Sequence, residues 1–258
     1  MIKPLAISCS CALLVLRRAS SEFPLAIIFC ILIAACSSDD YRTGDGDYSY
    51  YAAEMALFSL SDSLINNAEL DDGRTLELAS PLKSSVLRKN FKQSVVGDSC
   101  RLMLYYNKGV ETATTIKATE VHGANQVMMP RIALADTLKT PVKTDPLNVI
   151  SSWKSKNGNF YNYNISVKTG VVDGDAQSQT IGFVCDSISQ AADSETIVYL
   201  RLAHDQKEVP QFYSVEAFLS ISRIQISKLI DHYGITPAAA IKVNLTTNTY
   251  QGKKTIVL

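Results

Sequence analysis

The feature that most constrains the fold of this chain is a succession of short strand-like runs separated by turn residues, which begins at Tyr48. The runs are rich in β-branched and aromatic residues, as is typical of β-strands. Five of them before residue 135 predict a small β-barrel or β-sandwich. They cover residues 56–60, 65–70, 75–78, 101–106 and 115–121.

The segments between these runs carry residues that favour turns. Asp71-Asp72-Gly73 predicts a hairpin, because glycine accepts a positive φ and aspartate bonds to its own backbone. Gly97-Asp98 is expected to precede the fourth run, and Asn107-Lys108-Gly109 is expected to end it.

A stretch with no strong hydrophobic periodicity, residues 128–146, separates these runs from a second set. It holds three of the eight prolines and therefore predicts a domain boundary or an ordered crossover. We place a first domain at residues 48–135 and a second at 136–258, and the chain is predicted to be all-β. The second set has the near-regular spacing of a β-sandwich, with one helix at 224–233. Its strand-like runs are 149–153, 160–167, 179–185, 196–203, 213–221, 241–245 and 255–258, the last two joined around Gln251-Gly252.

Residues 1–35 are predicted to be an export signal. Arg17-Arg18 precedes an apolar run at 23–35, which is too short for a membrane-spanning helix of about 20 residues. The run ends in Ile33-Ala34-Ala35-Cys36, which resembles a bacterial lipobox. A second apolar run at 5–16 leaves two alternatives open: the leader is unusually long, or the true start lies downstream of Met1.

The lipobox resemblance implies that the Cys36 thiol is acylated and that Cys36 is the first residue of the mature protein. The alternative is a secreted or tethered chain in which a cysteine lies there by chance. Residues 36–47 are polar and contain glycine, so they are predicted to be a tether. Their acidic Asp39-Asp40 resembles the signal that sends lipoproteins of the Bacteroidota to the outer face of the outer membrane, although a solvated spacer has the same composition. We therefore expect a lipid-anchored protein of the outer membrane that is exposed at the cell surface.

The mature sequence lacks the common catalytic and cofactor-binding motifs. His122, His204 and His232 are scattered, and neither HExxH, GxSxG nor a glycine-rich phosphate loop occurs. Asp173-Gly174-Asp175 lacks the later glutamate of a calcium loop. We expect no enzymatic activity, no cofactor and no metal site.

The cysteine count and the charge exclude further classes. Cys100 and Cys185 each lie inside a strand-like run, and this predicts two buried thiols in separate cores rather than a disulfide framework. The chain has 25 basic and 25 acidic residues, so it has no electrostatic footprint for nucleic acid.

Aromatic residues are the remaining candidates for a binding surface. Tyr48, Tyr50 and Tyr51 open the first strand, and a second group surrounds the turn at Asn157-Gly158. Stacked aromatic rings serve sugars or protein partners. The alternative for the second group is core packing, and Trp153 in particular is expected to be a core anchor. That second group consists of Trp153, Phe160, Tyr161 and Tyr163.

Several segments in order resemble the NigD-like lipoproteins of the Bacteroidota. They include Leu70-Asp71-Asp72-Gly73-Arg74-Thr75-Leu76, Gly97-Asp98-Ser99-Cys100-Arg101-Leu102 and Thr196-Ile197-Val198-Tyr199-Leu200-Arg201-Leu202-Ala203-His204, all behind the lipobox. The resemblance implies an N-terminal OB-type barrel followed by a C-terminal β-sandwich. It ends near Ile224, so it implies nothing for the segment after Ser227.

The family is named after a gene beside a bacteriocin locus, for which immunity to the toxin has been proposed. We therefore expect a non-enzymatic, lipid-anchored envelope protein that binds a protein partner at the cell surface, in an immunity-like role. The alternative is a glycan-binding surface module that uses the groove of the OB-like barrel. The sequence does not decide the oligomeric state.

Overall fold

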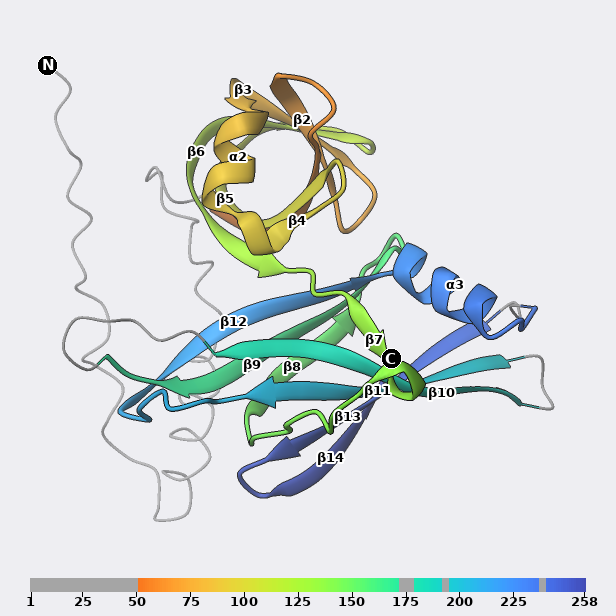
Figure 1. Ribbon diagram of the computed structural model, residues 1–258. Helices are drawn as coiled ribbons and strands as arrows, with labels where there is room; N and C mark the ends of the chain where they lie inside the picture. Colours follow the sequence, from red (N-terminus) through yellow and green to blue (C-terminus); the bar gives the residue numbers. More distant parts are fainter. Residues whose placement is uncertain (1–50, 172–178, 192–194, 237–239) are drawn as a thin grey trace, which may run out of the picture. The chain divides into compact units, whose positions relative to one another are not determined.

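The computed structural model describes residues 51–171, 179–191, 195–236 and 240–258, which belong to one compact unit, Tyr50–Leu258 (Figure 1). The predicted leader, Cys36, the tether and Asp173-Gly174-Asp175 lie outside the described residues.

The N-terminal half of the described chain is a closed barrel with a short helix beside it. The strands β1, β2 and β3 form an antiparallel meander, and β3 pairs in parallel with β6. β6 then pairs antiparallel with β5, and β5 pairs antiparallel with β1, which closes the barrel. This is the strand order of an OB-type barrel, so the predicted N-terminal fold is confirmed. The elements are β1 (Tyr51–Ser59), β2 (Leu64–Leu70), β3 (Thr75–Lys83), α2 (Ser84–Asn90), η1 (Lys92–Ser94), β4 (Val95–Val96), β5 (Ser99–Glu111) and β6 (Thr115–Met128).

Alternating burial along the barrel strands separates an inner from an outer face. On β5, Leu102 and Leu104 lie in the barrel core, whereas their odd-numbered neighbours lie on the outer wall. Leu87 of α2 joins the same core, so the helix packs against the barrel. These buried aliphatic side chains each contribute about 1.5–3 kcal/mol.

The C-terminal half is a β-sandwich of two sheets. One sheet consists of β12, β9 and β8 and continues from the end of β6, which pairs in parallel with β12. The other has the order β14-β13-β11-β10-β7, and Figure 1 shows the chain passing from β6 into β7. The elements are β7 (Ile132–Leu134), η2 (Ala135–Thr137), β8 (Asn148–Lys154), β9 (Phe160–Thr169), β10 (Thr180–Ala191), β11 (Glu195–Asp205), β12 (Tyr213–Ser222), α3 (Arg223–His232), β13 (Ala240–Thr249) and β14 (Gly252–Val257).

One hydrophobic core fills the sandwich. It combines Tyr163 and Ile165 of β9 with Phe183 of β10 and Leu200 of β11, and Ile226 of α3 packs into it. The helix α3 begins with a capping box, in which the Ser222 hydroxyl accepts a hydrogen bond from the Gln225 amide at 3.2 Å and the Gln225 side chain accepts one from the Ser222 amide at 2.9 Å. The predicted C-terminal sandwich and its helix are therefore confirmed.

Three local features differ from the sequence expectation. Asn107-Lys108-Gly109 was expected to end a strand, but β5 continues to Glu111 through register shifts against β6. Such bulges let a barrel strand bend without ending, and a side chain at Gly109 would come within 2.8 Å of Thr119. The helix α2 is not among the elements that the sequence predicts. Only Leu87 of its seven residues is buried, so the helix has no continuous apolar face that a sequence pattern would reveal. The strand β7 lies before residue 136 but pairs with β10 of the sandwich.

The two cysteines of the described residues, Cys100 and Cys185, are buried in hydrophobic cores, as predicted. Cys100 is in the barrel core and Cys185 is in the sandwich core, and both are free thiols. Burial raises the pKa of Cys100 to about 11 and also raises the pKa of Cys185, so both thiols are protonated at neutral pH.

We expect a fragment of residues 50–258 to show no thiol reactive with Ellman's reagent in native buffer and two reactive thiols in denaturant. The physical reason is that a buried, protonated thiol neither meets the reagent nor acts as a nucleophile. Absorbance of the released thionitrobenzoate measures both states. Rapid reaction of one thiol in native buffer would contradict its placement in a core.

Candidate functional site

Two turns, one from each half of the fold, line the candidate site. The β2–β3 turn at Asp71-Asp72-Gly73 is the predicted hairpin, with a φ of 88° at Gly73. The β8–β9 turn reverses around Gly158, whose φ is 75°. Both glycines adopt a backbone conformation that other residues rarely accept, so the sequence defines both turns locally.

The two turns contact each other directly. The backbone amide of Asn157 donates a hydrogen bond to the carbonyl oxygen of Asp71 at 2.9 Å. The side-chain amide of Asn157 donates to the Glu69 carboxylate at 2.9 Å, and that of Asn159 donates to the same carboxylate at 3.3 Å. Asp71 and Asn157, which the sequence predicts only as turn residues, therefore join the barrel to the sandwich.

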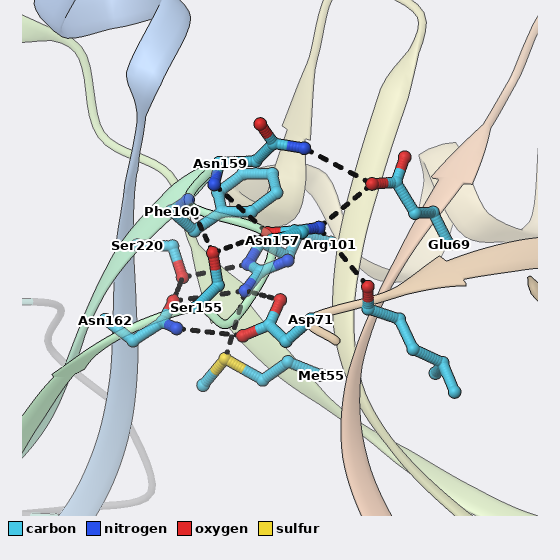
Figure 2. A network of polar contacts seen from close by, with 11 residues as sticks. Met55, Glu69, Asp71, Arg101, Ser155, Asn157, Asn159, Phe160, Asn162 and Ser220 are labelled. Atoms are coloured by element: carbon cyan, nitrogen blue, oxygen red, sulfur yellow. Dashed lines mark hydrogen bonds and ion pairs between the residues drawn. The ribbon is translucent and has the colours of Figure 1, made fainter. Parts of the chain in front are cut away.

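Arg101 of β5 is the buried centre of a polar network between the two halves (Figure 2). Its Nη2 donates to Oδ1 of Asp71 at 2.6 Å and to Oδ1 of Asn162 at 3.1 Å, and its Nε donates to Oγ of Ser220 at 2.9 Å. Asn162 in turn donates to Asp71 at 2.9 Å, and the Ser220 hydroxyl donates to Asn162 at 2.7 Å. Asp71, Asn162 and Ser220 therefore each have at least two partners, and the four side chains fix one another.

The guanidinium of Arg101 also lies over an aromatic ring. Its Cζ is 3.6 Å from the centroid of Phe160, and the Met55 sulfur lies 3.4 Å from its Nη2 (Figure 2). Burial lowers the pKa of Arg101, and the Asp71 carboxylate opposes that shift. A cation in such a place is tolerated because a carboxylate, two polar side chains and a ring face surround it.

A cleft of about 250 Å³ opens beside this network. Met55 and Asp71 of the barrel and Ser155 of the β8–β9 turn all line it, so the cleft is bounded by both halves of the fold. Met55 and Met103, which pair across β1 and β5, and Trp153 of β8 supply apolar surface. The full lining is Ala53, Glu54, Met55, Leu70, Asp71, Asp72, Met103, Trp153, Lys154, Ser155 and Lys156.

The expectation that Trp153 anchors the core is wrong. Trp153 is only partly buried and lines the cleft. The cause is its register: it pairs with Asn162, which faces the Arg101 network, whereas Tyr161 and Tyr163 on either side face the sandwich core. Paired residues of neighbouring strands share a face, so Trp153 lies on the side of the barrel.

The two walls of the cleft differ in their charged side chains. On the barrel wall, Glu54 accepts a hydrogen bond from the Tyr106 hydroxyl at 2.7 Å. Burial would raise the pKa of Asp72, but hydrogen bonds from the Arg74 side chain and backbone outweigh burial and lower it. The sandwich wall carries Lys154 and Lys156, both exposed. Glu54 also pairs with Lys108 at 3.3 Å and Asp72 pairs with Arg74 at 2.6 Å, so cations of the barrel neutralise both carboxylates. The cleft thus offers an apolar floor beside a rim that carries two exposed lysines.

The other aromatic residues of the second group lie in the interior. Phe160, Tyr161 and Tyr163 are all buried, and burial raises the pKa of Tyr161 and of Tyr163. They are therefore core residues rather than a binding surface. Tyr48 and Tyr50 lie outside the described residues, and Tyr51 is exposed.

A shallow groove of about 240 Å³ crosses the outer face of β1, β2 and β3, where the glycan alternative would place a ligand. The residues that line it are Leu57, Ser59, Asn67, Ala68, Glu69, Thr75 and Ser99. None of these lining residues is aromatic, so the groove offers no ring on which a sugar could stack.

The histidines do not form a catalytic or metal-binding group in the described part of the chain. Nδ1 of His204 lies 3.1 Å from the Asp145 carbonyl and Nε2 lies 2.7 Å from the Gln179 side chain, so both nitrogens have partners. Across residues 51–171, 179–191, 195–236 and 240–258, no group of three or more His, Cys, Asp or Glu side chains is suited to hold a metal ion.

Sequence reasoning missed the residues that build the site, namely Met55, Arg101, Met103, Asn162 and Ser220. One local signal was available: Arg101 interrupts the apolar run from Cys100 to Leu104. A charged residue at such a position indicates either a solvated outer wall or a buried partner, and the pattern alone does not distinguish these.

No family model and no curated protein sequence matches the chain. Solved structures do. A candidate toxin-related protein from Parabacteroides distasonis is 16% identical with a TM-score of 0.52, covering 81% of this chain and 92% of that chain. A candidate lipoprotein from Bacteroides fragilis is 14% identical with a TM-score of 0.52, covering 81% of this chain and 96% of that chain.

The chain shares the fold of these two proteins. A NigD-like immunity protein from Bacteroides caccae is also among the similar structures, at 17% identity and a TM-score of 0.48, covering 80% of this chain and 91% of that chain. Within the described residues, neither helix has the length and apolar character needed to cross a bilayer.

Proposed function

We propose that this chain is a non-enzymatic, lipid-anchored protein of the outer membrane that binds a protein partner at the cell surface through the cleft between barrel and sandwich. The anchor rests on the lipobox-like segment that ends at Cys36, and exposure at the surface rests on Asp39-Asp40. The name of the similar Bacteroides fragilis protein, a candidate lipoprotein, agrees with that anchor.

The observation that carries the proposal is the composition of the cleft. Its volume of about 250 Å³ suits one or two side chains of a partner rather than a whole element of structure. Tryptophan and methionine surfaces are typical of protein-binding hot spots, since both bury large apolar area and methionine adapts its shape. The exposed Lys154 and Lys156 on the rim would orient a partner segment that carries acidic residues.

Preorganisation supports the same conclusion. Arg101 holds the side chain of Asp71 in the β2–β3 turn, and Asn157 of the β8–β9 turn donates to the carbonyl oxygens of Leu70 and Asp71. The two turns that line the cleft are therefore fixed against each other. A cleft whose walls are fixed before binding loses less conformational entropy when a partner enters. An immunity role, in which the partner is a toxin, is the specific form of this proposal that the NigD-like resemblance favours.

The absence of enzymatic activity is supported by the state of the reactive side chains. Cys100 and Cys185 are buried and protonated, and His204 has partners at both ring nitrogens. The cleft lining contains neither cysteine nor histidine, so no pair of nucleophile and imidazole base faces it.

Site-specific photo-crosslinking on intact cells tests the proposal. We expect benzoylphenylalanine in place of Lys156, on the cleft rim, to give a discrete adduct with one protein. The same group in place of Lys253, on the far β14 strand, should give none. A membrane-impermeant biotin reagent applied to the same cells reports surface exposure.

A second substitution makes the test specific to the cleft floor. Trp153→Ala should reduce the Lys156 adduct about tenfold or more, because an aromatic anchor at an interface contributes about 2 kcal/mol or more. Phe212→Ala, which removes an aromatic side chain that is 71% exposed elsewhere, is the matched control and should leave the adduct unchanged. Equal adducts from both positions, or none from Lys156, would argue against the cleft as the binding site.

A further inference from the structure

Three aromatic rings lie next to one another on the outer wall of the barrel, at a distance from the groove of β1–β3. Tyr51 of β1 lies between the other two: its ring centroid is 6.2 Å from that of Tyr105 of β5 and 5.8 Å from that of His122 of β6. The planes differ by only 26° and 30°. We call Tyr51, Tyr105 and His122 the aromatic platform.

The strand pattern places these rings outside the barrel. Ala52, Leu104 and Tyr106 point into the barrel core, so their neighbours Tyr51 and Tyr105 point outward. Tyr105 pairs with Ala53 on one side and with Gly123 on the other.

Small residues therefore flank Tyr105 on both neighbouring strands. A side chain added at Gly123 would meet nothing within 4 Å, so the space beside Tyr105 is open. Ala53 is exposed and also lines the cleft, so the platform continues from the edge of that cleft.

The three rings stack with an offset, and each keeps part of its surface exposed. Parallel rings in full contact overlap face to face, whereas centroid distances near 6 Å correspond to offset rings that overlap at their edges. Tyr51 is 46% exposed. The Tyr105 hydroxyl accepts a hydrogen bond from the Asn125 side chain at 3.0 Å, which fixes the Tyr105 ring.

Polar groups surround the rings. Nδ1 of His122 lies 3.9 Å from the Glu120 carboxylate, and Asn125 is exposed beside Tyr105. The platform thus combines flat ring faces with a carboxylate and an amide at its border.

We propose that the aromatic platform binds a neutral saccharide. A pyranose ring has an apolar face of C–H groups and a border of hydroxyls, so it packs flat on an aromatic ring while its hydroxyls bond to surrounding carboxylates and amides. A nucleic acid would present the same stacking surface, but it needs basic groups for its phosphates. The platform has a carboxylate at its border and the chain has no net positive charge.

Affinity electrophoresis of the full chain in mild detergent tests this proposal. The probes are dextran, laminarin, yeast mannan and xylan, each cast into a native gel. We expect at least one polysaccharide to retard the wild-type protein. Tyr51→Ala and Tyr105→Ala should each raise the dissociation constant about tenfold or more, because each removes a stacking face. Tyr51→Phe keeps the ring and should bind like the wild type.

Tyr199→Ala is the matched control, since it removes an exposed tyrosine of the sandwich and should leave retardation unchanged. Far-UV circular dichroism establishes that each variant is folded. The proposal is overturned when none of the four polysaccharides retards the wild type, or when folded Tyr51→Ala and Tyr105→Ala are retarded as strongly as the wild type. Neither result bears on the cleft, because the Trp153 and Lys156 crosslinking test uses different residues and a protein partner.

Discussion

Arg101→Ala is expected to lower the free energy of unfolding by about 3–5 kcal/mol, which is the range for removing one partner of a buried ion pair. Arg101 is fully buried, so its loss leaves a void and removes one hydrogen-bond partner each from Asn162 and Ser220. The Asp71 carboxylate also loses its cation. Urea denaturation of residues 50–258, followed by circular dichroism and by the emission of the single tryptophan, measures the change.

The matched control is another arginine in an ion pair on the surface. Arg88 pairs with Asp98 at 2.8 Å, with 40% and 78% of the two side chains exposed, so Arg88→Ala should cost less than about 1 kcal/mol. Asp71→Asn keeps the shape of the side chain but leaves the Arg101 cation without a counter-charge, so it should be clearly more destabilising than Arg88→Ala. Equal midpoints for Arg101→Ala and Arg88→Ala would show that the network contributes little stability.

The strand layout could be predicted because its causes are local. A glycine at positive φ defines the turn at Gly73, and alternation over two residues defines the faces of β9 and β11. The helix α3 could also be predicted, since Ser222 and Gln225 form its capping box.

The candidate site could not be predicted because its causes are distant along the chain. Arg101 bonds to Asn162, which is 61 positions away, and to Ser220, which is 119 positions away. A local pattern shows that Arg101 is on the outer face of a barrel strand but not that another sheet covers that face. The same limit explains the wrong expectation for Trp153, because its face depends on its pairing with Asn162.

The network and the cleft are coupled through shared residues. Asp71 holds Arg101 with its side chain and the β8–β9 turn with its backbone carbonyl, and it also lines the cleft. A variant that breaks the network is therefore expected to change partner binding as well as stability. For this reason the crosslinking test substitutes Trp153, which is outside the network. Loss of the adduct in the Trp153→Ala variant would then show that the partner contacts the cleft surface.

Cys36→Ser is expected to move the protein almost completely from the membrane fraction to the soluble fraction. The proposed attachment is the acylated thiol of Cys36, and serine has no thiol to acylate. A single acyl chain holds a protein weakly and reversibly, so stable retention needs the several chains that bacterial lipoproteins carry, all of which require the Cys36 thiol. Ultracentrifugation after carbonate washing, with metabolic labelling by radioactive palmitate, measures both location and acylation.

Cys30→Ser is the matched control, because Cys30 lies in the same apolar run but before the predicted cleavage point. It should leave the protein in the membrane fraction and labelled. Retention of the Cys36→Ser protein together with normal palmitate labelling would show that the anchor is elsewhere and would remove the lipobox interpretation. Release of Cys36→Ser with loss of label, and retention of Cys30→Ser, is the outcome that assigns the anchor to Cys36, because the two substitutions differ only in which thiol of the leader region they remove.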